Sequence, residues 1–171
     1  MGDPRKQRKK YETPRHPWRR EQLEAELKLL GEYGLRNKRE LWRYKSMLSK
    51  IRAIARSLLG KPEEEREKLR REYIPKLVKL GLLPENAGID EVLDLDVKNL
   101  LERRLQTLVF KLNLAKSIHQ ARQLVTHGHI MIGDKIVSVP GYLVTKEEEA
   151  LIKYAPQSPF NNLNHPALKK N

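Results

Sequence analysis

The chain has 171 residues, enough for one or two domains, and its 35 Lys and Arg against 22 Asp and Glu give a net charge of +13. It has no cysteine, which excludes disulfides, cysteine-ligated metal sites and thiol nucleophiles. No apolar run approaches the roughly 18 residues of a membrane span, and the N-terminus lacks the apolar core of a signal peptide. We therefore expect a protein that stays in the compartment where it is made and binds an anionic partner.

Residues 1–20 are predicted to form a basic arm without a fold of its own. Eight Lys and Arg face only Asp3 and Glu12, and three prolines interrupt any regular helix. A segment of this composition does not offset the entropy of ordering by itself, so it orders on a polyanion or remains a solubilising tail. Tyr11 and Trp18 are available to stack or to anchor the arm. Its candidate phosphate contacts are Arg5, Lys6, Arg8, Lys9 and Lys10.

Residues 21–100 are predicted to be mainly helical. A short helix over 21–30 has three leucines on one side, Leu23, Leu27 and Leu30. A longer helix follows Asn37, its predicted N-cap, and ends at Gly60. Its half-buried stripe consists of Leu41, Tyr44, Leu48, Ile51, Ala55 and Leu58.

The opposite face of this longer helix is strongly basic. Its cations are Lys38, Arg39, Arg43, Lys45, Lys50, Arg52 and Arg56, opposed on the helix only by Glu40. That sign pattern indicates a surface facing nucleic acid, with Arg43 and Arg52 as candidate contacts. A membrane-surface helix is the alternative, but the bulky apolar face that such helices use is missing. Trp42 is assigned to the core.

Two further helices are expected before residue 113. One begins at Pro62, mixes charges as a solvent-facing or protein-facing helix does, and is expected to kink or break at Pro75. After a connector, Asp96 is predicted to cap a single helix over 97–112. A leucine stripe covers one side of that helix, and Arg103, Gln106 and Phe110 are expected to point away from it.

The stretch 117–139 predicts a helix followed by a hairpin. Ser117 is the N-cap candidate, and Gly128 falls where a positive φ ends the helix. Ile118, Ala121, Leu124 and Val125 form an inner face; the outer face has no acid and consists of His119, Gln120, Arg122, Gln123, Thr126 and His127. Two β-rich runs then flank the turn Gly133-Asp134. Two more short strands, 142–144 and 150–154, are expected around an acidic loop.

Several of these motifs resemble one family of RNA-binding domains. Glu102–Leu105, Ala115–Ser117, Gln120–Val125 and His127–Ile130 are similar to the domain named after ribosomal protein S-four. Met1–Pro4, Tyr11–Pro14, Gly34–Trp42 and Leu101–Thr107 are similar to the archaeal and eukaryotic branch of that ribosomal family. The chain departs from it at Gly133-Asp134, where Asn-Gly is usual, and at Asn113, where glycine is common.

The resemblance implies an α+β fold in which two helices pack on a short antiparallel sheet. The expected divisions are a basic arm at 1–20, a mainly helical part at 21–100, the RNA-binding domain at 101–154 and an extended tail at 155–171. The acidic loop at 145–149 is expected to face away from RNA. The implied RNA contacts of the small domain are Arg103, Arg104, Lys116, Ser117, His119, Gln120, Arg122, Gln123, His127 and His129.

The resemblance also implies a function. We expect a structural constituent of the small ribosomal subunit that binds small-subunit ribosomal RNA directly, acts early in assembly and bears on translational accuracy. Ribosomal protein S-five and the mRNA entrance are the implied neighbours, in the cytoplasm and without a cofactor. A free RNA-binding assembly or rescue factor, and a subunit of an RNA-modifying enzyme, are the alternatives.

Catalysis and metal binding find little support. His119, His127 and His129 lie close in sequence, but only Asp134 is a nearby carboxylate and the usual zinc spacings are missing. The sequence contains no nucleotide-binding glycine motif and no nucleophile elbow. DNA binding also fits the charge, yet basic residues spread over an arm, a long helix and a compact domain better match an irregular folded RNA.

Overall fold

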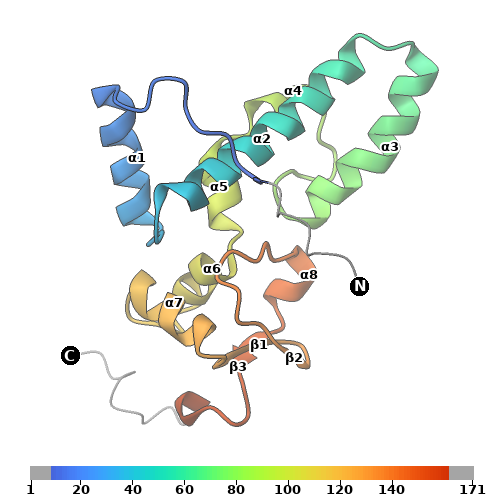
Figure 1. The fold of residues 1–171 in the computed structure, drawn as a ribbon. Coiled ribbons are helices and arrows are strands. Elements are labelled where there is room, and N and C mark those ends of the chain that lie inside the picture. Colours follow the sequence, from blue (N-terminus) through green and yellow to red (C-terminus); the bar gives the residue numbers. More distant parts are fainter. Residues whose placement is uncertain (1–8, 162–171) are drawn as a thin grey trace, which may run out of the picture.

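The structure is a computed structural model that describes residues 9–161, with the side chains of Lys68 and Leu69 left out. Arg5, Lys6 and Arg8, three of the candidate contacts, lie outside the described residues. A helical N-terminal part sits on one side of a small α+β domain (Figure 1). Among the described helices, none is long and apolar enough to cross a bilayer.

The described chain confirms the α+β class. Its helical part consists of α1 (Arg20–Glu32), α2 (Lys38–Leu59), α3 (Glu63–Lys79), α4 (Ile89–Asp94) and α5 (Val97–Glu102). The small domain consists of α6 (Leu105–Lys111), α7 (Ile118–Thr126), β1 (Ile130–Ile132), β2 (Lys135–Ile136), α8 (Lys146–Glu149) and β3 (Ile152–Tyr154). A 3-10 turn, Pro159–Asn161, follows.

Helix α2 is the centre of the helical part. Asn37 caps it as predicted, because its side chain accepts a hydrogen bond from the Glu40 amide at 3.1 Å, and the helix ends before Gly60. All six residues of the predicted stripe are buried. Five of them, all except Leu58, form one hydrophobic core with side chains from the α1–α2 turn, α3, the following connector, α4 and α5.

The sequence predicts a kink or a break at Pro75. The helix does not break there, because α3 runs without interruption from Glu63 to Lys79. Proline removes one backbone donor and crowds the preceding turn. Here Ile74 and Leu77, on either side of Pro75 in the sequence, are both buried, and Leu77 belongs to the first core. Packing on both sides of the proline therefore outweighs the local penalty.

The single helix expected over 97–112 is also wrong, because the chain forms α5 and α6 with a break at Arg103 and Arg104. Asp96 caps α5 as predicted, its carboxylate accepting from the Val97 amide at 2.7 Å. At the break, the Leu105 amide donates to the Tyr142 carbonyl at 2.8 Å, and Arg104 forms an isolated antiparallel bridge with Leu143. A distant segment of the chain thus replaces the helical hydrogen bonds that would have continued α5.

The small domain packs α6 and α7 against a three-stranded antiparallel sheet of order β2-β1-β3. Gly133 alone carries a positive φ (58°) in the two-residue turn, as a glycine-first hairpin requires. Gly128 and Asn113 have positive φ values of 74° and 58°, as their positions predict. The second hydrophobic core draws on α6, α7, β1 and β3 and includes Leu105, Val109, Ala121, Leu124, Val125, Ile130 and Ile152.

Two segments near the C-terminus differ from expectation. The acidic residues 146–149 form the short helix α8, capped by a reciprocal Thr145–Glu148 pair, and residues 142–144 make only the isolated bridge. The tail expected to be extended is packed over 155–161, where Ala155 and Ser158 are buried. Phe160 meets the His129 ring edge-on, with the centroids 4.9 Å apart. The rest of that tail lies outside the described residues.

Candidate nucleic-acid interface

A groove of about 1060 Å³ lies between the described part of the arm and the first turns of α2. Its lining consists of Lys9, Lys10, Tyr11, Asn37, Arg39, Glu40 and Arg43. Four of these seven residues are cations and one is an acid. All four cations are exposed, and none of them pairs with an acid within the described residues. A groove of this charge is suited to a phosphate backbone.

The arm contacts α2 through Tyr11 and Glu12, which differs from the expectation that it orders only on a polyanion. The Glu12 amide donates to the Ser46 hydroxyl at 2.9 Å, and the Tyr11 ring lies 6.0 Å from the Trp42 ring. The Lys9 ammonium lies 4.7 Å from the centre of the Tyr11 ring. One wall of the groove is therefore attached to α2.

Glu40, the acid in the groove, is neutralised by two arginines of the small domain. Its carboxylate accepts from Arg122 at 2.7 Å and from Arg104 at 3.0 Å. Burial alone would raise the pKa of Glu40, but the hydrogen bonds from Arg122 and Arg104 hold it below its ordinary value. One carboxylate therefore joins α2 to α6 and α7 and presents no net negative charge to the groove.

Arg104 and Gln106 are interior residues, which corrects the expectation that they are accessible. The Arg104 side chain is 1% exposed and its guanidinium lies 5.2 Å from the centre of the Tyr44 ring. The Gln106 amide nitrogen donates to the carbonyls of Gly34 and Ile118, both at 3.0 Å. A buried guanidinium has no route to a phosphate, so Arg104 is a structural residue at the contact between the two parts.

The outer face of α7 is not free of acids once the chain folds. Arg122, the cation at its centre, has 22% of its side chain exposed and is paired with Glu40. The acid comes from α2, so no pattern within α7 reveals it. Of the other outer side chains, His119, Gln123, Thr126 and His127 are exposed, and so is Lys116 just before the helix. Around the cap, the Ser117 hydroxyl accepts from the Gln120 amide, while the Gln120 side chain accepts from the Lys116 amide.

Three other candidate contacts are engaged within the protein. Arg103 pairs with Glu149 at 2.7 Å, and only 13% of its side chain is exposed. Arg52 donates to the Leu95 carbonyl at 2.6 Å, and Ser158 lies 3.1 Å from the His129 ring nitrogen Nδ1. One residue of the acidic segment, Glu149, is therefore an ion-pair partner of a predicted RNA contact, Arg103.

Glu26 on α1 has a role that was not predicted, and it is only 1% exposed. Its carboxylate accepts from Lys45 at 2.8 Å and from the Trp42 indole at 3.1 Å, and it lies 3.5 Å from Lys38. Two of the seven α2 cations are thus neutralised by a different helix. The signal was its spacing, because Glu26 falls on the same helix face as Leu23 and Leu30.

Helix α1 consequently turns an unexpected leucine outwards. Leu27, predicted to lie on the packed side, is 69% exposed. The buried Glu26 takes the central position of that side, and Leu29 and Leu30 pack at its end. Of the α2 cations, Arg39, Arg43, Lys50 and Arg56 remain exposed. Arg39 lines the groove beside Arg43, although only Arg43 and Arg52 were predicted as contacts from this helix.

Comparisons with known proteins agree with this arrangement. Residues 5–102 match the ribosomal protein S4/S9 N-terminal domain, and residues 103–149 match the S4 domain. The small ribosomal subunit protein uS4 of Ignicoccus hospitalis is 58% identical over 160 residues, which cover 94% of this chain and 96% of that protein. That of Hyperthermus butylicus is 54% identical over 160 residues, 94% of this chain and 91% of that protein.

The chain belongs to the uS4 family. The S4 domain begins at Arg103, where α5 gives way to α6. The break that the sequence did not predict is therefore the boundary between the two matched regions. Members of the uS4 family are ribosomal structural proteins and not enzymes.

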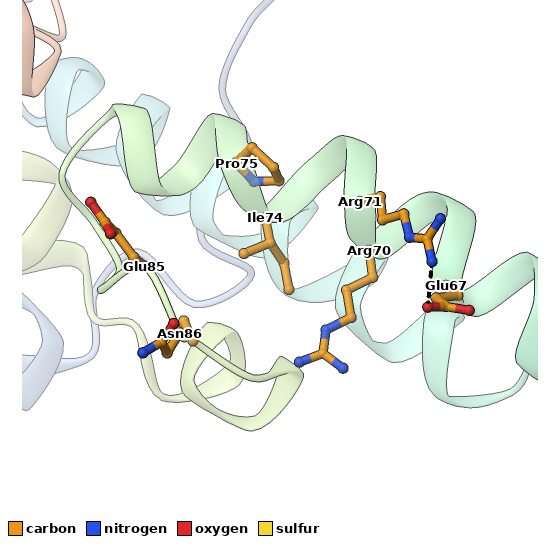
Figure 2. A pocket seen from close by; sticks show the side chains of 8 residues that line it. Glu67, Arg70, Arg71, Ile74, Pro75, Glu85 and Asn86 are labelled. Carbon is orange, nitrogen blue, oxygen red and sulfur yellow. Dashed lines mark hydrogen bonds and ion pairs between the residues drawn. The ribbon is translucent and has the colours of Figure 1, made fainter.

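A second hollow of the uS4 chain, about 450 Å³, lies between α3 and residues 85–87 (Figure 2). Arg71 pairs with Glu67 at 2.7 Å on its rim, and Arg70 and Glu85 add one charge of each sign. Ile74, Pro75 and Ala87 supply apolar surface. The balanced charges do not favour a phosphate backbone, in keeping with the expectation that α3 faces solvent or a protein.

The buried Glu26 and the half-buried Glu40 of this uS4 chain predict a loss of stability in acid. Burial would raise the pKa of Glu26, but the hydrogen bonds from Lys45, Gln22 and Trp42 lower it. The pKa of Glu40 is also lowered. A lowered pKa in the folded state contributes stability above the unfolded-state value, and this stability is lost as pH falls through the folded-state value. We expect the free energy of unfolding to fall progressively below the ordinary value of 4.5.

The measurement is urea unfolding at a series of pH values. Glu26→Gln will flatten the acid limb of the stability curve while lowering stability at neutral pH. Glu85→Gln, at an exposed position in the connector, is the matched control and will leave the acid limb unchanged. Equal curves for the native chain and Glu26→Gln contradict the assignment of a lowered pKa.

Proposed function

We propose that this protein is a structural constituent of the small ribosomal subunit and that it binds small-subunit ribosomal RNA directly. The observation that carries this proposal is the basic groove, whose four cations, Lys9, Lys10, Arg39 and Arg43, are exposed. The one acid of its lining, Glu40, is paired with Arg104 and Arg122. Membership of the uS4 family supports the same conclusion, with localisation on cytoplasmic ribosomes.

The proposed RNA surface continues from the groove to the start of α7. The Glu40–Arg122 pair connects the first turn of α2 to α7, and Gln106 connects the carbonyls of Gly34 and Ile118. Exposed Lys116 and His119 lie at the beginning of α7, close in the chain to this contact. A surface built from an arm and two helix starts matches an irregular RNA fold, which proteins recognise through shape and backbone.

We also propose the finer roles that the family resemblance implies: action early in assembly of the subunit, a bearing on translational accuracy, and contact with ribosomal protein S-five near the mRNA entrance. The mixed charges of α3 and its hollow offer a surface for a protein neighbour, whereas the basic groove suits RNA. An early role predicts that ribosomal RNA binds the purified chain without other proteins.

Reversing two groove cations tests the RNA surface. The double variant Arg39→Glu with Arg43→Glu will weaken binding to small-subunit ribosomal RNA and flatten the plot of log K against log salt. If both residues contact phosphates, the slope will change by about 1.4 to 1.8 units, at about 0.7 to 0.9 per contact. Filter binding between low and moderate salt measures both quantities.

The matched control is Arg70→Glu with Lys76→Glu, which reverses the same amount of charge at exposed positions of α3. Both double variants should keep the native circular dichroism spectrum, since none of the four side chains is buried. Equal losses of affinity would mean that only net charge matters, and the groove would lose its special role.

Ribosome fractionation separates a structural constituent from a free assembly or rescue factor. A constituent will remain on small subunits, in equal copy number with the other subunit proteins, through a high-salt wash. Release of the chain by that wash, with normal binding to purified ribosomal RNA, would instead favour the free factor.

A further inference from the structure

Trp18 is the most exposed large apolar side chain among the described residues, at 87%. The other tryptophan, Trp42, is half-buried and donates its indole hydrogen to Glu26. Exposing an indole leaves a large apolar area in water, because tryptophan buries about 150–250 Å² when it is covered. Packing within the described chain therefore does not explain why a tryptophan occupies this position.

The backbone makes hydrogen bonds on both sides of Trp18. Upstream, the Glu12 amide is bonded to the Ser46 hydroxyl of α2. Downstream, the Arg19 amide donates to the His16 carbonyl at 3.4 Å in a turn, and α1 begins at Arg20. A ring on a positioned backbone loses little conformational entropy when a flat partner covers it.

Cations surround Trp18 in the chain. Arg15, Arg19 and Arg20 are all exposed. Arg15 has no acid partner among the described residues, and the pairs Arg19–Glu21 and Arg20–Glu24 join side chains that are 66–90% exposed. Such surface pairs contribute little free energy, so these arginines can exchange a carboxylate for a phosphate at small cost.

An aromatic ring among cations fits an unpaired nucleotide. Proteins that bind single-stranded or looped RNA stack bases on aromatic side chains while Arg and Lys contact the flanking phosphates. The sequence neighbours of Trp18 are His16, Pro17, Arg19 and Arg20, which include two cations and no acid. This charge favours an anionic partner, which RNA is.

We propose that Trp18 stacks on an unpaired base of small-subunit ribosomal RNA, with Arg15, Arg19 and Arg20 on the adjoining phosphates. This contact rests on the proposed RNA-binding function and adds to the groove a second, base-directed contact at the start of α1. The groove binds phosphate, whereas the indole requires a base.

The first experiment uses fluorescence. The emission of Trp18 is obtained as the difference between the full chain and Trp18→Phe, which leaves Trp42 as the remaining tryptophan. Small-subunit ribosomal RNA will quench this difference signal. Heparin, a polyanion without bases, will occupy the cations without the same quenching.

The second experiment measures affinity for the same RNA. Trp18→Leu keeps apolar mass but cannot stack, and it will weaken binding about 5- to 150-fold, the range expected for one base on an aromatic ring. Trp18→Phe will retain part of the affinity, and the thermal transition of both variants will stay unchanged because the side chain is exposed. Leu27→Ala, at another exposed apolar position, is the control for surface change and will bind normally.

The outcomes separate this contact from the function on which it rests. If the unaltered chain does not bind the ribosomal RNA, the proposed function fails. If it binds and Trp18→Leu binds equally well, or if heparin quenches as strongly as RNA, the stacking contact is wrong while RNA binding stands. Normal RNA affinity with loss of Trp18→Leu from washed small subunits would overturn stacking in favour of a protein contact.

Discussion

Glu40→Gln is expected to destabilise the folded protein by up to about 3 to 5 kcal/mol, the range for removing one partner of a buried ion pair, because Arg104 is buried although 26% of the Glu40 side chain is exposed. The substitution keeps the shape of the side chain but leaves two guanidinium groups, Arg104 and Arg122, without a counterion. Arg104 is 1% exposed, and its Nε and Nη1 atoms already have no hydrogen-bond partner within the described chain. The buried charge would then be poorly compensated. Urea unfolding at neutral pH measures the difference.

Glu24→Gln is the matched control for this prediction. Glu24 also pairs with an arginine at 2.8 Å, but the two side chains are 66% and 90% exposed. We expect a change of about 0 to 1 kcal/mol, as for other surface pairs. A small effect of Glu40→Gln, comparable with that of Glu24→Gln, would show that the contact between α2 and the small domain does not depend on this carboxylate.

Gly34→Ala is expected to have a similarly large effect, about 2 to 5 kcal/mol. Gly34 has a φ of 56°, which costs an L-residue roughly 1–2 kcal/mol. An added Cβ would also lie 2.8 Å from the Gln106 amide nitrogen and 3.0 Å from two carbons of Ile118. Overpacking of this kind typically costs about 1–3 kcal/mol. Thermal and urea unfolding measure the loss, and RNA affinity will fall as the groove and α7 separate.

Gly31→Ala, three residues earlier, is the internal control. Nothing lies within 4 Å of its added Cβ, and the residue is in the last turn of α1. Alanine should therefore stabilise the helix, by roughly 0.5–1 kcal/mol. Opposite signs for the two substitutions are the expected result; a loss at both positions would point to a general intolerance of the turn.

Local chemistry was enough for much of the fold. The caps at Asn37, Asp96 and Ser117 form as their side chains predict, since each carboxamide, carboxylate or hydroxyl accepts from an amide near the start of its own helix. The positive φ values at Asn113 and Gly128 likewise depend on short-range sterics. The stripe of α2 is buried because its spacing places every member on one face.

The sequence by itself also determined that the chain is strongly basic, that it has two core-forming parts and that it resembles the uS4 family. Those features depend on residue types, short spacings and motifs, which can be read directly from the sequence. It did not determine where a helix stops when a distant segment intervenes. Leu143 and Tyr142 end α5 from about forty positions away, by supplying the bridge and the carbonyl that the break at Arg104 needs.

Only the tertiary structure decided which cations are available to RNA. Glu26 on α1, Glu40 on α2 and Glu149 on α8 each neutralise arginines or lysines of other elements. A charge pattern read along one helix cannot include such partners, because Coulomb attraction depends on distance in space and not on separation in sequence. The arm, the start of α2 and the start of α7 became one candidate surface only when folding paired Glu40 with Arg104 and Arg122 and left Lys9, Lys10, Arg39 and Arg43 exposed.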